Sequence, residues 1–289
     1  MRPAFLLKAC LLPEPEQFPL ADDLALICDC AKEAGELAES FLPQVHKGEK
    51  VWKKNDKTPV TEADLAVNHL LQQRLSTARP DYGWLSEETA DEQSARDRKR
   101  VWVVDPIDGT RAFARPNDPY WCIAIALVEN QKPVAGVLFA PELDELFMAY
   151  AGGGAFLNGK RLAVSRAEQE EGAKLISTRE VINHRGWPTP WPSVELCDPK
   201  PNATLYRMAL VATGKWDATF ALGRKSDWDL AAGAILVSEA GGIASTHLGE
   251  DFTFNRKNPA QRSMLAAGPE LHSLLLERIR HVDLTDPNA

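Results

Sequence analysis

The stretch from Asp105 to Thr110 constrains this chain more than any other. It reads Asp-Pro-Ile-Asp-Gly-Thr and follows the apolar run Val101–Val104, which predicts a buried strand ending in a tight turn. Proline fixes its own φ and has no N–H, and Gly109 can adopt conformations closed to other residues. Thr110 is a natural N-cap for a following helix. The turn therefore carries two carboxylates, at Asp105 and Asp108, beside free backbone N–H groups.

These groups suit metal and phosphate chemistry. Carboxylate oxygens bind hard cations such as Mg²⁺, and N–H groups at a helix start bind phosphate. The segment thus offers both halves of a metal-dependent phosphoryl-transfer site. A turn with solvated carboxylates is the alternative, because Asp-Gly turns are common.

Two further acidic residues lie at the ends of apolar segments, one after an expected strand and one before an expected helix. Glu87 ends an expected short strand, Tyr82–Ser86, and is a candidate metal ligand or part of a solvated loop. Asp229 lies in Trp-Asp-Leu-Ala-Ala-Gly, just before an apolar helix that we expect to run to about Ala240. It is a candidate ligand or a helix N-cap, and one carboxylate can be both because its second oxygen stays free.

The segment Asp56–Asp64 reads Asp-Lys-Thr-Pro-Val-Thr-Glu-Ala-Asp. Thr61 and Asp64 are an expected capping pair at the start of a helix that runs to Thr77. Local sequence favours a capping role alone for both residues. The alternative is that Asp64 is also a metal ligand.

Composition excludes several functional classes. The 289 residues are 44% hydrophobic, enough for one large or two small domains with a substantial core. The net charge is −8 and no basic stripe occurs, so binding of a nucleic acid polymer is not expected. No apolar run reaches the length of a membrane-spanning helix. The six histidines are scattered, which argues against a histidine-ligated transition metal.

The five cysteines and the N-terminal residues bear on location. An odd number of cysteines without a Cys-x-x-Cys pair indicates reduced thiols in a cytoplasmic protein and no zinc site. The first residues are interrupted by Lys8 and followed by Pro13 and Pro15, so a signal peptide is not expected. We expect residues 1–21 to be a flexible tail.

The chain changes character near residue 165. Before it, two expected helices, Asp22–Leu42 (ended by Pro43) and Glu62–Thr77, precede strands rich in β-branched and aromatic residues. Asn158-Gly159 predicts a hairpin turn. The triple glycine at 152–154 lacks the Lys-Ser/Thr and the helix of a nucleotide-binding loop, so a bulge or tight bend is expected.

After residue 165, short strands alternate with helices expected near Thr204–Thr213, at Leu230–Ala240 and after Pro269. Such alternation suggests a sheet flanked by helices. We therefore expect an N-terminal half, 22–165, with most candidate ligands and a smaller α/β half, 166–289, with Asp229. Together they would form one compact catalytic unit.

In their order, the acidic motifs resemble the inositol monophosphatase superfamily of Mg²⁺-dependent, lithium-sensitive phosphatases. The resemblance runs from about Asp22 to Gly268, and the ordered set is far more specific than any single motif. It implies an α+β fold, a layered α-β-α-β-α sandwich of the inositol monophosphatase/fructose-1,6-bisphosphatase type. The layers would be two N-terminal helices, an antiparallel sheet, central helices, a smaller mixed sheet and outer helices.

The resemblance also implies a ligand set. In the family, the residues that match Glu87 and Asp105 bind one Mg²⁺ together with the backbone carbonyl that matches Ile107. Those that match Asp105, Asp108 and Asp229 bind a second ion. Magnesium keeps several waters, so two or three carboxylates for each ion suffice.

Catalytic roles follow from the same resemblance. Glu87 and Thr110 match residues that orient the attacking water, and Asp64 matches one that pairs with this threonine and reaches a weaker third ion. The N–H groups of Gly109 and Thr110 would hold phosphate oxygens. The segment His46–Asn55 matches a mobile loop that helps to complete the metal site. The implied reaction is direct hydrolysis of a phosphate monoester.

The implied cofactors are two or three Mg²⁺ ions, with Mn²⁺ as an alternative and Li⁺ as an inhibitor. The implied partners are a small phosphorylated metabolite and a second copy of the chain in a homodimer. The candidate substrate-binding residues are Gly109, Thr110, Arg224, Lys225 and Asp229.

The substrate is open. Inositol monophosphatases carry a glutamate seven residues before the Trp-Asp aspartate, where this chain has Leu222. Arg224 and Lys225 could bind a second phosphate or be solvated loop cations, and Asp227 could meet a substrate hydroxyl. The alternatives to an inositol phosphate are a 3′(2′),5′-bisphosphate nucleotide, histidinol phosphate and fructose-1,6-bisphosphate. A non-catalytic homologue is disfavoured, because every carboxylate named above and Thr110 are present.

Trp187 and Trp191 lie in a stiff, proline-rich segment. Packing is the favoured interpretation, with substrate flanking and a dimer contact left as alternatives.

Overall fold

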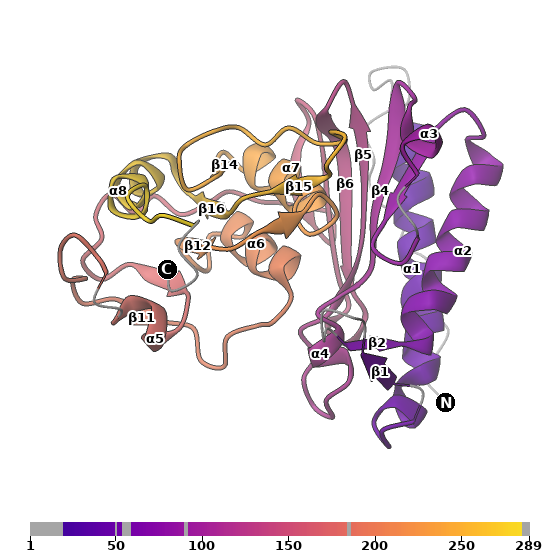
Figure 1. Ribbon diagram of the computed structural model, residues 1–289, viewed down its shortest axis with the longest axis horizontal. Helices are drawn as coiled ribbons and strands as arrows, with labels where there is room; N and C mark the ends of the chain where they lie inside the picture. The colour runs from indigo at the N-terminus through magenta and orange to yellow at the C-terminus, as the bar shows by residue number, and fades with distance from the viewer. Residues whose placement is uncertain (1–19, 50, 54–58, 90–91, 184–185, 285–289) are drawn as a thin grey trace.

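The computed structural model describes residues 20–49, 51–53, 59–89, 92–183 and 186–284. Figure 1 shows a layer of helices, a large sheet seen edge-on, central helices, a second sheet and outer helices. This order confirms the layered α+β sandwich predicted from the sequence. The predicted N-terminal tail, apart from its last two residues, lies outside the described residues.

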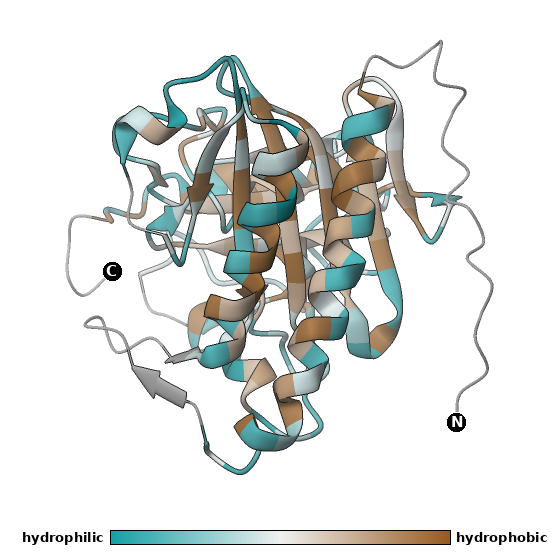
Figure 2. Ribbon diagram, turned by 90° about the vertical axis from the view of Figure 1, so that its right-hand side faces the viewer, coloured by the Kyte–Doolittle hydropathy of each residue, from teal (hydrophilic) through white to brown (hydrophobic). Residues whose placement is uncertain are grey.

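The first layer consists of α1 (Ala21–Val45) and α2 (Glu62–Ala78), which lie side by side across the large sheet (Figures 1 and 2). In Figure 2 the strands behind them are mostly hydrophobic. The predicted helix end at Pro43 is wrong, because α1 continues through this proline. A proline removes one helical N–H, and the last turn is still closed by the N–H of His46, which donates to the Leu42 carbonyl at 2.9 Å. Asp22, the expected first residue of this helix, lies in the first turn of α1, where a negative charge stabilises the helix dipole.

The large sheet has seven strands in chain order, and only its first pair is parallel. The central strands are buried on both faces, because helices cover both sides. The strands are β3 (Gly83–Ser86), β4 (Arg100–Asp108), β5 (Cys122–Glu129), β6 (Lys132–Ala140), β7 (Glu145–Tyr150), β8 (Gly154–Leu157) and β9 (Lys160–Arg161).

Two turns of this sheet match their predictions. Asn158 and Gly159 both have positive φ, 47° and 79°, and join β8 to β9 as a hairpin. The triple glycine forms the tight bend between β7 and β8. The N–H groups of Gly152 and Gly154 each donate at 2.8 Å to the carboxylate of Glu239, so this loop binds an acid of its own chain.

The central layer consists of α6 (Thr204–Ala212) and α7 (Ala231–Glu239), which pack on the inner face of the large sheet. Gly136 on β6 makes the close approach of α7 possible. A Cβ atom there would lie 2.7 Å from Cγ2 of Ile235 and 3.1 Å from Cα of Ala232. The sheet and α7 therefore meet at a distance that only glycine allows.

The second sheet has five strands in the order β11-β10-β12-β16-β14, with α8 (Pro269–Ile279) packed on its outer face. Its strands are β10 (Lys174–Ile176), β11 (Glu195–Leu196), β12 (Ala218–Ala221), β14 (Ile243–Ser245) and β16 (Met264–Ala267). The remaining elements are short: β1 (Val51–Lys53), β2 (Pro59–Thr61), α3 (Gln93–Arg96), α4 (Thr110–Phe113), the 3-10 turn η2 (Pro141–Leu143), α5 (Arg179–Ile182), β13 (Lys225–Ser226) and β15 (Ala260–Gln261).

Part of the expected loop His46–Asn55 forms β1, which pairs antiparallel with β2. Residues 50 and 54–58 lie outside the described residues, and so does the start of the Asp56–Asp64 motif. Among the helices that the structure describes, none is long and apolar enough to cross a membrane.

We expect Gly136→Ala to destabilise the protein by about 1–3 kcal/mol, because a methyl group at this packed contact forces α7 away from the sheet. Urea unfolding followed by circular dichroism measures the change. Gly223→Ala is the matched control, since a Cβ there meets nothing within 4 Å. Equal unfolding midpoints for both variants would show that the contact tolerates a side chain.

Candidate functional site

Asp105 and Asp108 reach the same side of β4 because the strand bulges between them. Asp105 pairs with Ala124 of β5, whereas Asp108 pairs with Cys122, so three steps on β4 match two on β5. Residues three apart in a regular strand point to opposite faces, and one extra residue reverses this. Ile107 accordingly lies in the apolar core under α1 and α2. The bulge thus turns both carboxylates toward the central helices.

Asp108 binds the first turn of α6. Its side chain is 6% exposed, and its Oδ1 and Oδ2 accept the backbone N–H groups of Thr204 (3.0 Å) and Leu205 (2.6 Å). These N–H groups have no acceptor within the helix. The N-cap position is Ala203, which has no side-chain oxygen. The carboxylate of Asp108 therefore acts as the cap of a helix that is 96 residues further along the chain.

Glu87 lies beside Asp105. The strands β3 and β4 are parallel, with Ser86 opposite Val104, and the N–H of Glu87 donates to the Val104 carbonyl at 3.3 Å. This bond extends the pairing by one residue. The two acids that the sequence predicted as neighbours thus stand at the carboxyl ends of adjacent parallel strands.

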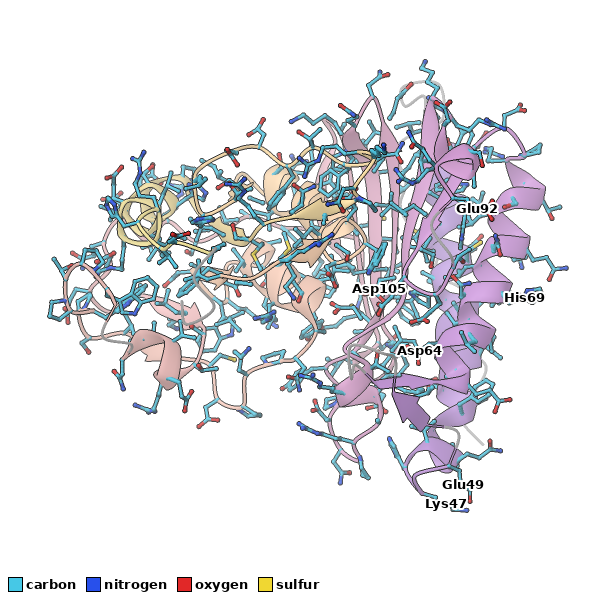
Figure 3. The ribbon with its side chains drawn as sticks, in the orientation of Figure 1. Lys47, Glu49, Asp64, His69, Glu92 and Asp105 are labelled. Atoms are coloured by element: carbon cyan, nitrogen blue, oxygen red, sulfur yellow. The ribbon has the colours of Figure 1, made fainter. Side chains whose placement is uncertain are left out.

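The predicted capping pair at the start of α2 is confirmed. The N–H and Oγ1 of Thr61 donate to Oδ2 of Asp64 at 2.7 and 2.6 Å, and the Asp64 N–H lies 3.4 Å from Thr61 Oγ1. The other carboxylate oxygen, Oδ1, lies 3.3 Å from Thr110 Oγ1. Figure 3 labels Asp64 in the first turn of α2 and Asp105 on β4, and the charge of Asp64 contributes to the raised pKa of Asp105. Asp64 therefore serves α2 with one oxygen and faces the site with the other.

The N-cap role predicted for Thr110 is wrong. Gly109 occupies that position with φ 91°, and Thr110 is the first residue of α4. A Cβ at Gly109 would lie 3.0 Å from both the Tyr120 carbonyl oxygen and the Ala203 Cβ, so space and backbone conformation both require glycine. The Thr110 hydroxyl, released from capping, lies 3.2 Å from the Ile107 carbonyl and faces the site.

Asp229 precedes α7 but does not cap it. The N-cap position is Leu230, and Oδ2 of Asp229 instead accepts the N–H of Ser226 at 2.7 Å. The acid thus closes the turn between β13 and α7. Its charge raises the pKa of both Asp105 and Asp108, which places it beside them.

Arg224 precedes β13 and Lys225 begins it, and their side chains have different hydrogen-bond partners. Nζ of Lys225 donates to Oγ1 of Thr204 at 3.1 Å, beside the start of α6. Nη2 of Arg224 donates to Oδ1 of Asn258 at 2.8 Å, on the exposed side. Only Lys225 of this pair lies beside the carboxylates.

The suggested contact of Asp227 with a substrate hydroxyl is wrong. The residue is fully buried, and its Oδ2 and Oδ1 accept the N–H of Asn255 (2.6 Å) and Nε2 of Gln261 (2.9 Å). Both oxygens are thus engaged in holding the loop between β14 and β15.

Burial and neighbouring negative charges disfavour the charged forms of Asp64, Asp105 and Asp108. Burial, then the charges of Glu87 and Asp108, raise the pKa of Asp105 well above its usual range. Burial and the charge of Asp229 raise the pKa of Asp108 to about 7, against the opposing effect of the N–H groups of α6. Burial raises the pKa of Asp64 to about 7. The fold therefore holds more negative charge here than it can stabilise alone.

The donors are all oxygen atoms, the type that hard divalent cations select. Within the described ranges, no three His, Cys, Asp or Glu side chains converge as for a metal ion. By its chemistry the donor set fits a hard cation and not zinc or copper.

Trp187 and Trp191 pack, as the favoured interpretation predicted. Their rings meet edge to face at 5.5 Å, and Trp191 stacks on Phe220 at 5.9 Å. The guanidinium of Arg278 lies 4.7 Å from the Trp191 ring centre. Trp187 also lines a cavity.

Sequence reasoning missed two basic residues near the site. Arg207 lies on α6 and is 6% exposed, and Lys200 precedes that helix and is half-buried. Neither belongs to a motif. The one signal in the sequence is their position, four residues before and three residues after Thr204.

Comparisons with known proteins identify the family of this chain. Residues 20–284 match the inositol monophosphatase family. The chain is 30% identical over 276 residues to Inositol monophosphatase 1 of Solanum lycopersicum, covering 90% of this chain and 96% of that protein. It is 32% identical over 249 residues to a histidinol-phosphatase of Chlorobaculum parvum, covering 80% and 88%.

Solved structures show the same fold. The extragenic suppressor protein suhB of Bartonella henselae has a TM-score of 0.76 at 28% identity, covering 91% of this chain and 100% of that one. The inositol monophosphatase of Anabaena has a TM-score of 0.74 at 25% identity, covering 92% and 98%. The chain therefore belongs to the inositol monophosphatase family and is a phosphoric monoester hydrolase of that type.

Proposed function

We propose that the enzyme hydrolyses a small phosphate monoester at a magnesium site formed by Glu87, Asp105, Asp108, Asp229 and the Ile107 carbonyl. The observation that carries this proposal is the bulge of β4, which brings two buried acids to one side with their pKa values raised. A divalent cation relieves such an excess of negative charge, and the all-oxygen donor set suits Mg²⁺.

The residues around the acids take distinct roles. When bound, Mg²⁺ supplies charge stabilisation and lowers the pKa of a water. Glu87 and Thr110 would orient the attacking water. The 3.3 Å distance between Thr110 Oγ1 and Asp64 Oδ1 supports the pairing of Asp64 with this threonine. The N–H groups of Gly109 and Thr110 hold phosphate oxygens. Because α4 has only four residues, this contact depends on the N–H groups and not on a long helix dipole.

The overall step needs no covalent enzyme intermediate. The water oxygen forms a bond to phosphorus, the phosphorus–oxygen bond to the alcohol breaks, and a proton ends on the released alcohol. The products are the alcohol and inorganic phosphate.

The proposal extends to ions, assembly and location. Two or three Mg²⁺ ions bind, with Asp64 reaching the weakest, Mn²⁺ substitutes and Li⁺ inhibits, as the family resemblance implies. The resemblance also supports a homodimer. The odd number of cysteines, without a Cys-x-x-Cys pair, supports a reducing compartment such as the cytoplasm.

Asp105→Asn should lower phosphate release more than about 100-fold, the scale for losing one charged group of a preorganised site. The metal-free variant should melt at the same temperature as the parent or higher, because the change removes a buried, repelled charge. Phosphate release and thermal melting measure the two effects. Asp251→Asn, an exposed acid, is the control and should keep full activity. Substantial activity in Asp105→Asn would refute the site assignment.

The metal-free enzyme should lose stability as pH rises. A buried carboxyl whose folded pKa lies above its unfolded value stabilises the protein below the unfolded pKa, and this contribution disappears as pH rises through the folded pKa. For Asp64 and Asp108 the window extends from 3.8 to about 7.

Mg²⁺ binds the ionised carboxylates, so the increase in melting temperature that it causes should grow between pH 5.5 and pH 8. Melting curves with Mg²⁺ and with a chelator, recorded across this range, measure the increase. An increase of the same size at both ends would contradict the assignment of these acids to the metal site.

A further inference from the structure

Three basic side chains, Lys200, Arg207 and Lys225, gather at the start of α6; we name them the basic cluster. Nζ of Lys225 and Nη2 of Arg207 both donate to Oγ1 of Thr204, at 3.1 and 3.0 Å. The backbone N–H of the same threonine donates to Asp108. The basic cluster is thus joined through one residue to a proposed metal ligand.

The hydrogen-bond acceptors that Arg207 and Lys225 use are neutral. The acceptors of Arg207 are the Ala203 carbonyl and the Thr204 hydroxyl, although Arg207 is 6% exposed. Burial and the positive charges of Arg207 and Lys225 lower the pKa of Lys200 to about 8, which shows that the three charges lie close together. Buried like charges persist only where negative charge compensates them.

That compensation comes from the carboxylates of the site. Burial lowers the pKa of Arg207, and the charges of Asp108 and Asp229 oppose this effect. In the proposed function, on which this inference rests, these same carboxylates hold a divalent cation. Once they do so, the basic cluster needs negative charge from another source.

A cavity adjoins the basic cluster. Its volume is about 730 Å³, and its lining includes Lys200, Arg207, Trp187, Phe220 and Leu222. Cavities of this size enclose small-molecule ligands. Two acids, Glu180 and Asp283, also line it, but they are exposed and their charges are screened by solvent, whereas Arg207 is buried.

The aromatic part of the lining is held in place. Nε1 of Trp187 donates to the Val181 carbonyl at 2.7 Å, and the Trp187 ring meets Phe220 edge to face at 6.4 Å. Leu222 adds an apolar surface beside Phe220 at the end of β12. A fixed apolar wall and buried positive charge therefore share one cavity, and Arg207 joins this cavity to Asp108 through Thr204.

The geometry points to a substrate whose alcohol half carries a second anionic group and a planar apolar ring. The basic cluster binds the anion, and Trp187, Phe220 and Leu222 pack against the ring. A nucleoside that carries two phosphates has both features. Inositol monophosphate has neither, and a sugar bisphosphate has only the second anion.

The test is phosphate release by the full chain with Mg²⁺ from four substrates that separate the two features. They are 3′-phosphoadenosine 5′-phosphate (ring and second anion), adenosine 2′-phosphate (ring alone), fructose-1,6-bisphosphate (second anion alone) and inositol-1-phosphate (neither). We expect kcat/KM for the first to exceed that for each of the others by tenfold or more. A value for inositol-1-phosphate equal to or above it would overturn the inference and leave the proposed function standing. No release from any of the four would overturn this inference, and no release from histidinol phosphate as well would overturn the proposed function with it.

Variants locate the binding of the second anion. Lys200→Met should lower the ratio of kcat/KM for the bisphosphonucleotide over inositol-1-phosphate by tenfold or more, and Lys200→Arg should restore it, because the charge returns. Leu222→Glu should lower the same ratio by placing a negative charge in the cavity. Lys160→Met, a change at an exposed lysine of β9, is the control and should keep it. If Lys200→Met and Leu222→Glu both kept the ratio, the anion would bind elsewhere and the inference would fail.

Discussion

The bonds from the first two N–H groups of α6 to the Asp108 carboxylate hold the site together. They join β4 of the large sheet to a helix of the central layer, and both carboxylate oxygens take part. The negative charge of Asp108 also lies at the positive end of the helix dipole, which stabilises the helix. Because α6 carries Thr204, to which Arg207 and Lys225 donate, the position of the basic cluster depends on the same bonds. One buried acid, Asp108, thus fixes the position of the basic cluster relative to the carboxylates of the site.

The fold keeps this site at a cost in stability. Burial and the charges of neighbouring acids raise the pKa of Asp105 and of Asp108, and no local rule of packing favours burying these acids together. The surrounding strands compensate, because β4 and β5 are buried on both faces and the cores on either side hold the bulge in place. Sites of this kind break rules of local structure that the rest of the chain obeys. Here the broken rule is charge burial, and in the proposed function a bound cation offsets the destabilisation.

Local patterns predicted most of the fold but not the contacts that complete the site. The helix periodicity, the capping pair Thr61–Asp64 and the Asn158 hairpin are short-range signals, and each was confirmed. Residues three apart, such as Asp105 and Asp108, would face opposite ways in a regular strand, so only the bulge explains why both face the central helices. The burial of Arg207 and the separation of Arg224 from Lys225 likewise arise from tertiary packing, which periodicity within one element does not encode.

Charge balance links the two sides of the site. The acids at Asp108 and Asp229 compensate the basic cluster, so each side lowers the cost of burying the other. A divalent cation on the acids shifts this balance and strengthens the attraction of the basic cluster for an anion. By thermodynamic linkage, an anion on the basic cluster strengthens cation binding by the same factor. Binding of metal and of a doubly anionic substrate is therefore expected to be mutually reinforcing, with Thr204 as the residue through which the two sides meet.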